Sequence, residues 1–322
     1  MVTTTALQII GGLILLFFGG EILVRGAVAL AKDLGLSAFI IGLTVVAYGT
    51  SSPELVISVQ SALDGHPDIA LGNVIGSNIS NMLCVIGLTA IIYPIAINKE
   101  ESGFDGKIML GVTLLLYALC ALNMLNIISA VIFLGFLVGY TYFIFHNEKK
   151  KKAKKHQSEE TTSEIEEQMN VKLNRWQAIR LCIGGIVLLM FGGDILIKGA
   201  VELARMAGLS EAVIGVTLIA MGGSAPELIT SVVAAFHKKA DIVIGNIIGS
   251  NMFNILGIMG ATTALESIKV DEKFLQQDLP ILAITTAILL GILLTRLVFN
   301  RLLGGFFFAG YVGYLAMQFY GQ

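Results

Sequence analysis

Long stretches without a charged side chain recur along this chain and leave few folds open to it. They cover residues 7–20, 37–47, 108–122, 127–145, 281–295 and 302–317. A helix that crosses the hydrocarbon core of a bilayer needs about 20 apolar residues. Charged residues make up 14% of the 322 residues and the mean hydropathy is +0.82, whereas soluble domains average about 25% charged residues. The sequence therefore predicts an all-α polytopic membrane protein.

The second half of the chain repeats the first. Residues 42–54 (GLTVVAYGTSSPE) align without a gap with residues 215–227 (GVTLIAMGGSAPE). Residues 72–83 (GNVIGSNISNML) align in the same way with residues 245–256 (GNIIGSNMFNIL), and both alignments have an offset of 173 residues. Because chance does not hold one register over two separate motifs, we interpret the halves as duplicated copies.

Ten transmembrane helices fit this duplication, five in each copy. We expect them at about 7–30, 37–63, 69–93, 107–122 and 127–146, and at about 177–203, 210–236, 242–264, 278–296 and 301–320. Since five is odd, the second copy enters the membrane from the opposite side, which makes the copies inverted repeats. The predicted domains are the first five-helix repeat at 1–146, a charged linker at 147–175 and the second, inverted five-helix repeat at 176–322.

The placement of lysine and arginine predicts the orientation of the chain. With the N-terminus outside, the cytoplasmic segments collect sixteen lysines and arginines, whereas the external segments collect only Arg205, Lys269 and Lys273. Cytoplasmic loops of membrane proteins carry the excess of these residues. We expect a multi-pass protein of the plasma (inner) membrane with both termini extracytoplasmic and the linker cytoplasmic.

Each copy places one glutamate inside an apolar span, Glu54 in the second span and Glu227 in the seventh. A carboxylate at such a depth costs about 3 kcal/mol or more and marks an ion or proton pathway. Further oxygen-bearing side chains lie on the same helices or on the next ones, namely Thr50, Ser51, Ser224, Ser77, Asn81, Ser250 and Asn254. Hard oxygen ligands without histidine or thiol suit Na⁺, Ca²⁺ or Mg²⁺ and disfavour zinc and copper.

A proline lies one residue before each of these glutamates. Pro53 cannot donate a hydrogen bond to the carbonyl of Gly49, and Pro226 cannot donate one to the carbonyl of Gly222. Carbonyls freed in this way are tolerated in a membrane only where protein, water or an ion satisfies them. Interrupted helices at matching positions of two halves indicate a transport site.

Other polar residues in the spans have a structural explanation. Glu21 with Arg25, and Asp194 with Lys198, are spaced four apart and are interpreted as ion pairs on helix surfaces. The four histidines fall at span ends or in the linker and receive no role, and the three cysteines are interpreted as small buried hydrophobes. The net charge of −2 and the lack of a basic stripe give no reason to expect nucleic acid as a partner.

The motifs GTSSPE with GNVIGSNISN, and GGSAPE with GNIIGSNMFN, resemble the two alpha repeats of the cation/calcium antiporter superfamily, and most closely its prokaryotic sodium/calcium exchanger branch. The resemblance covers essentially all ten spans. It implies ion sites at the middle of the membrane and alternating access by sliding of the first and sixth helices. The activity it implies is exchange of Ca²⁺ for Na⁺ without ATP, with membrane lipid around the protein and no cofactor beyond the transported ions.

The resemblance also implies a role for particular residues. Glu54 and Glu227 would hold Ca²⁺, and Asn81 and Asn254 would lie beside it. The Na⁺ ligands would be the carbonyls of Ala47 and Ala220 and the hydroxyls of Thr50, Ser51, Ser224, Ser77 and Ser250. Two departures from the family pattern concern ion stoichiometry and coupling. Gly223 stands where the first copy has Thr50, and Asn254 stands where some relatives carry an acid.

Two other kinds of transport remain open at this point. A H⁺/Ca²⁺ antiporter is the closest alternative, because carboxylates exchange a proton as readily as Na⁺. A passive cation channel is a further alternative, although channels favour rings of carbonyls or acids along a continuous pore. An enzyme is not expected, since neither histidine nor cysteine lies in the motifs. The sequence does not predict an oligomeric state.

Overall fold

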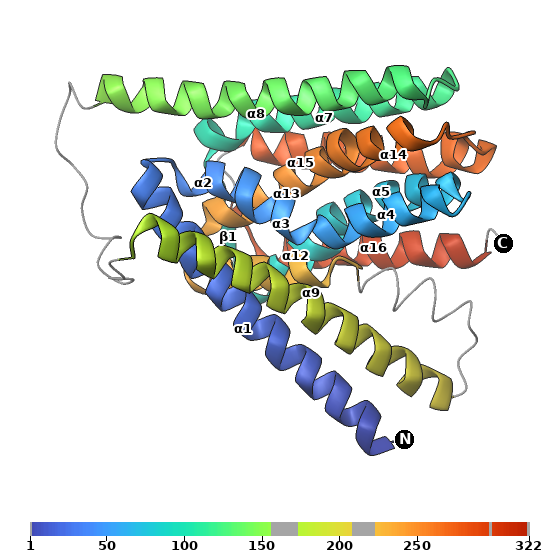
Figure 1. Cartoon of the computed structure of the whole chain (residues 1–322), viewed down its shortest axis with the longest axis horizontal. Helices are drawn as coiled ribbons and strands as arrows, with labels where there is room; N and C mark the ends of the chain where they lie inside the picture. Colours follow the sequence, from blue (N-terminus) through green and yellow to red (C-terminus); the bar gives the residue numbers. More distant parts are fainter. Residues whose placement is uncertain (1, 156–172, 208–222, 296–297, 321–322) are drawn as a thin grey trace.

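The computed structural model describes residues 2–155, 173–207, 223–295 and 298–320, which are almost entirely helical (Figure 1). The first half contains α1 (Val2–Leu34), α2 (Ala38–Ile41), η1 (Gly42–Val46), α3 (Ala47–Thr50), α4 (Ser52–Leu63), α5 (Pro67–Ser80), η2 (Asn81–Val85), α6 (Ile86–Ile92), β1 (Ile95–Ala96), α7 (Lys99–Ala121) and α8 (Ile127–Lys155). The second half contains α9 (Arg175–Met206), α12 (Ala225–Phe236), α13 (Ala240–Phe253), η4 (Asn254–Ile258), α14 (Met259–Leu265), η5 (Phe274–Asp278), α15 (Leu279–Leu293), β2 (Val298–Phe299) and α16 (Arg301–Tyr320). The η segments are π-helical turns.

Among the described residues, seven helices or continuous helical runs are long and apolar enough to cross a bilayer, and the bent pair Ala38–Thr50 and Ser52–Leu63 makes eight when counted as one span. Each predicted span overlaps a described helix. Of the predicted span 210–236, only the part from residue 223 is described, and it contains the shorter apolar helix α12. The predicted span 301–320 coincides with α16. The protein is thus a polytopic helical membrane protein.

Helices α1 and α9 lie side by side and run at a slant to most of the other helices (Figure 1). Glycines spaced seven apart line their contact: Gly12, Gly19 and Gly26 on α1, and Gly185, Gly192 and Gly199 on α9. A Cβ added at Gly185 would lie 2.6 Å from the backbone nitrogen of Leu23, so no larger residue fits there without a shift. Small residues of this kind let membrane helices approach closely. The two helices therefore form one tightly packed unit.

The continuous run α13–η4–α14 lies at the centre of the molecule and is almost wholly buried. Gly245 and Gly249 of this run pack directly on the backbone of the first half. A Cβ at Gly249 would lie 2.1 Å from the carbonyl oxygen of Leu43, whereas one at the matching Gly76 of the first half would meet nothing within 4 Å. The small-residue spacing therefore serves close packing at Gly249 and not at Gly76.

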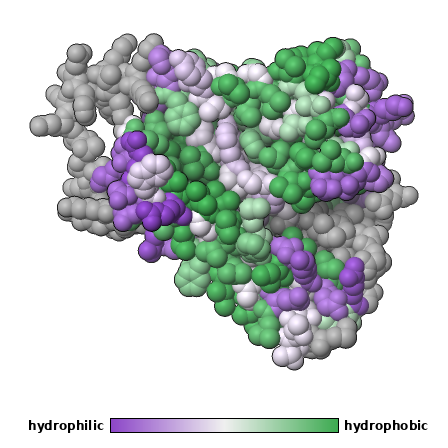
Figure 2. All heavy atoms as spheres, viewed as in Figure 1, coloured by the Kyte–Doolittle hydropathy of each residue, from purple (hydrophilic) through white to green (hydrophobic). Residues whose placement is uncertain are grey.

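The outer helices keep large apolar side chains on the molecular surface. Phe17 on α1, Val131 on α8 and Phe191 on α9 are each more than half exposed. Figure 2 shows hydrophobic residues over much of the middle of this face, with hydrophilic residues gathered mainly toward its ends. A surface of this kind is suited to contact with lipid, because in water it would expose a large apolar area.

Candidate ion-binding site

Two helix breaks with the same backbone geometry position the site. The first separates α3 from α4 at Ser51, whose φ and ψ are −84° and 8°, and the helix axes bend there by 44°. The second precedes α12 at Ser224, whose φ and ψ are −85° and 9°. In both copies a proline follows within the first turn of the next helix and prevents a regular continuation. The interruption predicted from the prolines is present in both halves.

Glu54 and Glu227 occupy the first turns of α4 and α12, directly after these breaks, and each is only 1% exposed. The hydroxyl of Ser51 donates to Oε1 of Glu227 at 3.0 Å. In the reverse direction, a Cβ added at Gly223 would lie 3.8 Å from Oε1 of Glu54. Each break therefore lies against the glutamate of the other half, and the two carboxylates share one buried space.

Several buried oxygens of the predicted site residues have no hydrogen-bond partner among the described residues. They include Oε2 of Glu54, Oε2 of Glu227, Oδ1 of Asn81, Oδ1 of Asn254 and the hydroxyl of Ser224. A buried polar atom without a partner costs free energy, and a carboxylate costs much more than a neutral group. An oxygen-coordinated cation would offset this cost. The described residues contain no cluster of three or more histidine, cysteine, aspartate or glutamate side chains, so such a cation would depend on two carboxylates and neutral oxygens.

The predicted asparagines belong to a cluster of amides that joins the halves. Asn81 donates to Oδ1 of Asn251 at 3.3 Å, and Asn254 donates to Oδ1 of Asn78 at 2.9 Å. Each bond is the counterpart of the other at the offset of 173 residues. Asn81 and Asn254 also begin the π-helical turns η2 and η4, and such turns are frequent at functional sites. The amide nitrogens of Asn81 and Asn254 are engaged in these bonds. Their carbonyl oxygens have no partner among the described residues and are therefore available to a ligand.

The carbonyl of Ala47 collects several of the predicted Na⁺ ligands. It accepts hydrogen bonds from the backbone N–H of Ser51 at 3.0 Å, the hydroxyl of Thr50 at 3.3 Å and the hydroxyl of Ser250 at 3.5 Å. Ala220, the counterpart of Ala47, lies outside the described residues. Ser77, the counterpart of Ser250, is buried on α5.

Two asparagines that the sequence analysis did not single out support the broken helices. Asn73 on α5 donates to the hydroxyl of Ser58 at 2.9 Å and to the backbone carbonyl of Glu54 at 3.3 Å. Its counterpart Asn246 donates to Ser231 at 3.3 Å and accepts from Thr50 at 3.4 Å. A sequence signal for both was present. Each is the asparagine that follows the first glycine of the repeated motif GNVIGSN or GNIIGSN, and each contacts a serine that is also repeated, Ser58 or Ser231.

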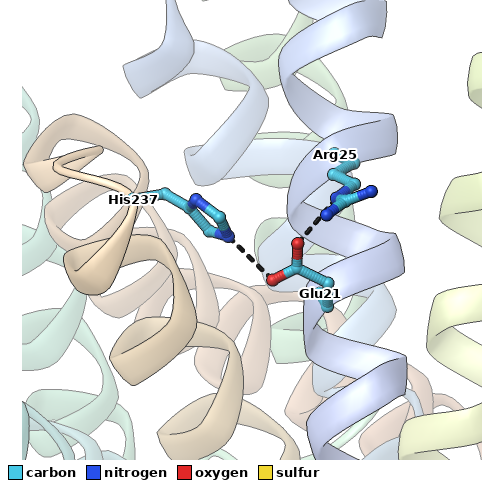
Figure 3. Close-up of polar contacts among 3 residues, drawn as sticks. All are labelled: Glu21, Arg25 and His237. Atoms are coloured by element: carbon cyan, nitrogen blue, oxygen red, sulfur yellow. Dashed lines mark hydrogen bonds and ion pairs between the residues drawn. The ribbon is translucent and has the colours of Figure 1, made fainter. Parts of the chain in front are cut away.

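The two ion pairs predicted outside the site are present, at 2.6 Å between Glu21 and Arg25 and at 2.7 Å between Asp194 and Lys198. The interpretation of His237 as a residue without a role was wrong. Its Nε2 lies 2.7 Å from Oε2 of Glu21 (Figure 3). The periodicity of one helix does not reveal this contact, because it joins α1 to the end of α12.

Comparison with known proteins identifies the family of this chain. The model of the "Sodium/calcium exchanger protein" family matches residues 4–146 and 178–320. The chain belongs to this family. A putative antiporter, CaxA, from Alkalimonas amylolytica is 35% identical over 96% of this chain and 96% of its own length. The sodium/calcium exchanger MaX1 from Methanosarcina acetivorans is 30% identical over 99% of this chain and 100% of its own.

A solved structure of the sodium-calcium exchanger NCX_Mj has the same fold, with a TM-score of 0.81, 28% sequence identity and coverage of 99% of this chain and 100% of the other. The resemblance to the prokaryotic exchanger branch is thereby confirmed, and this family member is a transmembrane antiporter. Its relatives are transporters, which accords with the expectation that it is not an enzyme.

Proposed function

We propose that this family member exchanges Ca²⁺ for Na⁺ across the plasma membrane by alternating access, with Ca²⁺ held between Glu54 and Glu227. The observation that carries the proposal is the pair of buried carboxylates, each with an unpartnered oxygen, placed at equivalent breaks of the two halves. Two carboxylates neutralise one divalent cation. Ca²⁺ takes about six to eight oxygen ligands, and the free oxygens of Asn81, Asn254 and Ser224 are available to complete the set with water.

The hydroxyls and carbonyls beside the glutamates are neutral ligands that suit a monovalent cation. We assign Na⁺ to the carbonyls of Ala47 and Ala220 and to the hydroxyls of Thr50, Ser51, Ser224, Ser77 and Ser250. The cluster around the Ala47 carbonyl supports this assignment, because neutral oxygens suit a monovalent ion better than a divalent one. No cofactor beyond the transported ions enters the proposal.

The architecture that we propose consists of ten helices in two inverted halves, 1–146 and 176–322, joined by a cytoplasmic linker at 147–175. Contacts between loops support it, since each joins segments assigned to the same side. On the side assigned to the cytoplasm, Arg175 pairs with Asp33 at 2.6 Å and β1 pairs with β2. On the opposite side, the backbone N–H of Ile268 donates to the carbonyl of Leu125 at 2.9 Å.

The proposal is tested by uptake of radiolabelled Ca²⁺ into proteoliposomes under imposed gradients. An outward Na⁺ gradient is expected to drive uptake that persists when a protonophore collapses the pH difference. Uptake that follows a H⁺ gradient and is insensitive to Na⁺ would replace Na⁺ by H⁺ as the coupling ion. Ca²⁺ flux that runs downhill without either gradient would identify a channel and refute the antiport mechanism for Ca²⁺.

A further inference from the structure

Glu21 connects α1 to the turn between α12 and α13 (Figure 3). Its Oε1 accepts from Nε of Arg25 at 2.6 Å, and its Oε2 lies 2.7 Å from Nε2 of His237. The side chains of Glu21 and His237 are 17% and 30% exposed, so water screens the contact only in part. A carboxylate and an imidazole form an ion pair only when the imidazole is protonated, and the imidazole is the side chain that ordinarily titrates between about pH 5 and 8.

The duplication shows what this contact becomes when the protein opens to the other side. In a transporter of two inverted halves, the second access state arises when the halves exchange their conformations. At the offset of 173 residues, Glu21 corresponds to Asp194 and His237 corresponds to Asp64. The opposite-facing state would therefore bring together two acids, which cannot form an ion pair with each other. In the state described here, Asp194 pairs with Lys198 at 2.7 Å and Asp64 accepts from Gln60 at 2.9 Å.

We propose that Glu21 and His237 form a proton-dependent latch that stabilises the access state described here over the opposite-facing state. The inference rests on the inverted-repeat alternating access proposed above. Protonation of His237 turns a hydrogen bond into an ion pair and holds α1 to the α12–α13 turn. Because the pair is partly exposed, we expect acid to change the ratio of the two states by about two- to fivefold.

Other charged or titratable groups surround the latch. Arg25 comes from α1, Lys238 and Lys239 follow His237 in its own turn, and Asp241 lies in the first turn of α13. Tyr93, at the end of α6, has its ring 6.4 Å from that of Phe236. Glu21 is the acid in hydrogen-bond contact with His237. Substitution of His237 or Glu21 should therefore remove the response to acid.

The latch is tested by double electron–electron resonance in proteoliposomes. Spin labels on cysteines placed at the exposed residues Phe17 of α1 and Ile92 of α6 report the position of α1, with the three native cysteines replaced by alanine. Lowering the pH from about 8 to 5.5 is expected to shift the distance distribution toward the state described here. H237Q and E21Q are expected to lose that shift. D64H/H237Q is expected to reverse it, because the new histidine can pair with Asp194 in the opposite-facing state while the pair of Glu21 with His237 is absent.

The same distances are measured in E54Q/E227Q protein, so that protonation of the two site glutamates cannot produce the shift. An acid response of H237Q equal to that of the unsubstituted protein would overturn the latch, as would a D64H/H237Q response in the original direction. Neither result depends on which ions are carried. Absence of Na⁺-driven Ca²⁺ uptake in the unsubstituted protein would instead refute the proposed function and leave the distance measurement valid.

Discussion

At the scale of single residues, the two halves of the site differ by one hydroxyl. Thr50 of the first half donates to the carbonyl of Ala47 and lies within reach of Asn246. Its counterpart Gly223 carries no side chain, although a Cβ there would lie 3.8 Å from Oε1 of Glu54. The two glutamates are equally buried but do not have equal neighbours. Under the proposed function, this difference would make the two halves unequal as ligands for a monovalent ion.

Replacing either glutamate is expected to remove most Ca²⁺ transport. In Glu54→Gln or Glu227→Gln, one of two charges is lost and a divalent ion would be half neutralised in a space that excludes bulk water. Loss of one charged ligand corresponds to a drop in Na⁺-driven Ca²⁺ uptake of about tenfold or more. Asp194→Asn, in an exposed ion pair on α9, is the control and should retain most activity. Uptake above about a third of the unsubstituted level would remove that glutamate from the central site.

Adding the missing hydroxyl is expected to strengthen Na⁺ binding. In Gly223→Thr, the new side chain would begin 3.8 Å from Oε1 of Glu54, at the position that Thr50 occupies in the first half. One additional neutral oxygen contributes about 1 kcal/mol, which is about a fivefold change in affinity. The concentration of Na⁺ that half-inhibits Ca²⁺ uptake should fall accordingly, while Gly223→Ala, which adds volume without oxygen, should not lower it. An equal response of both variants would contradict a ligand role at this position.

At the scale of helices and turns, the sequence predicts the breaks better than the packing around them. The prolines indicate where α4 and α12 begin, because proline removes a backbone donor. The π-helical turns at Asn81 and Asn254 were not predicted, since a π-turn follows from contacts between helices and has no composition of its own. For the same reason, the roles of Asn73 and Asn246 became visible only once α5 and α13 lay beside the broken helices.

The contact of α13 with η1 should tolerate no added carbon at Gly249. A Cβ there would lie 2.1 Å from the carbonyl oxygen of Leu43, and relief of such an overlap by a backbone shift costs about 1–3 kcal/mol. Gly249→Ala is therefore expected to lower the thermal unfolding midpoint of the detergent-solubilised protein. Gly76→Ala is the matched control, because nothing lies within 4 Å of a Cβ at that position. Equal midpoints for the two variants would show that this contact is not as close as described.

At the scale of the whole molecule, the order of spans and the duplication are readable from the sequence, but the pairing of α1 with α9 across the halves is not. The apolar blocks predict that these helices cross the membrane. They do not say which helix is the partner. His237 was misjudged for the same reason, because the residue that it contacts lies 216 positions away.

Chemical cross-linking can show whether α1 and α9 move as one body. A bifunctional thiol reagent in D33C/R175C protein would tie the end of α1 to the start of α9, which already meet in an ion pair at 2.6 Å. Na⁺-driven Ca²⁺ uptake is expected to survive this link. In E21C/H237C protein the same reagent would tie α1 to the α12–α13 turn, and uptake is expected to fall at least about tenfold, because α1 and α9 would be held to the helices past which they must slide. Inhibition by the first link would contradict joint movement.

The matching backbone angles at Ser51 and Ser224 also bear on how the two copies diverged after the gene duplication. After the ancestral gene was duplicated, the sequences around the two breaks diverged, so that Thr50 aligns with Gly223 and Ser52 aligns with Ala225. The backbone angles at the serine of each break did not drift. What the two copies inherited in common is a shape of the main chain, and side chains were free to specialise upon it. A protein engineer can therefore transplant a substitution from one break to the other and expect the same scaffold to receive it.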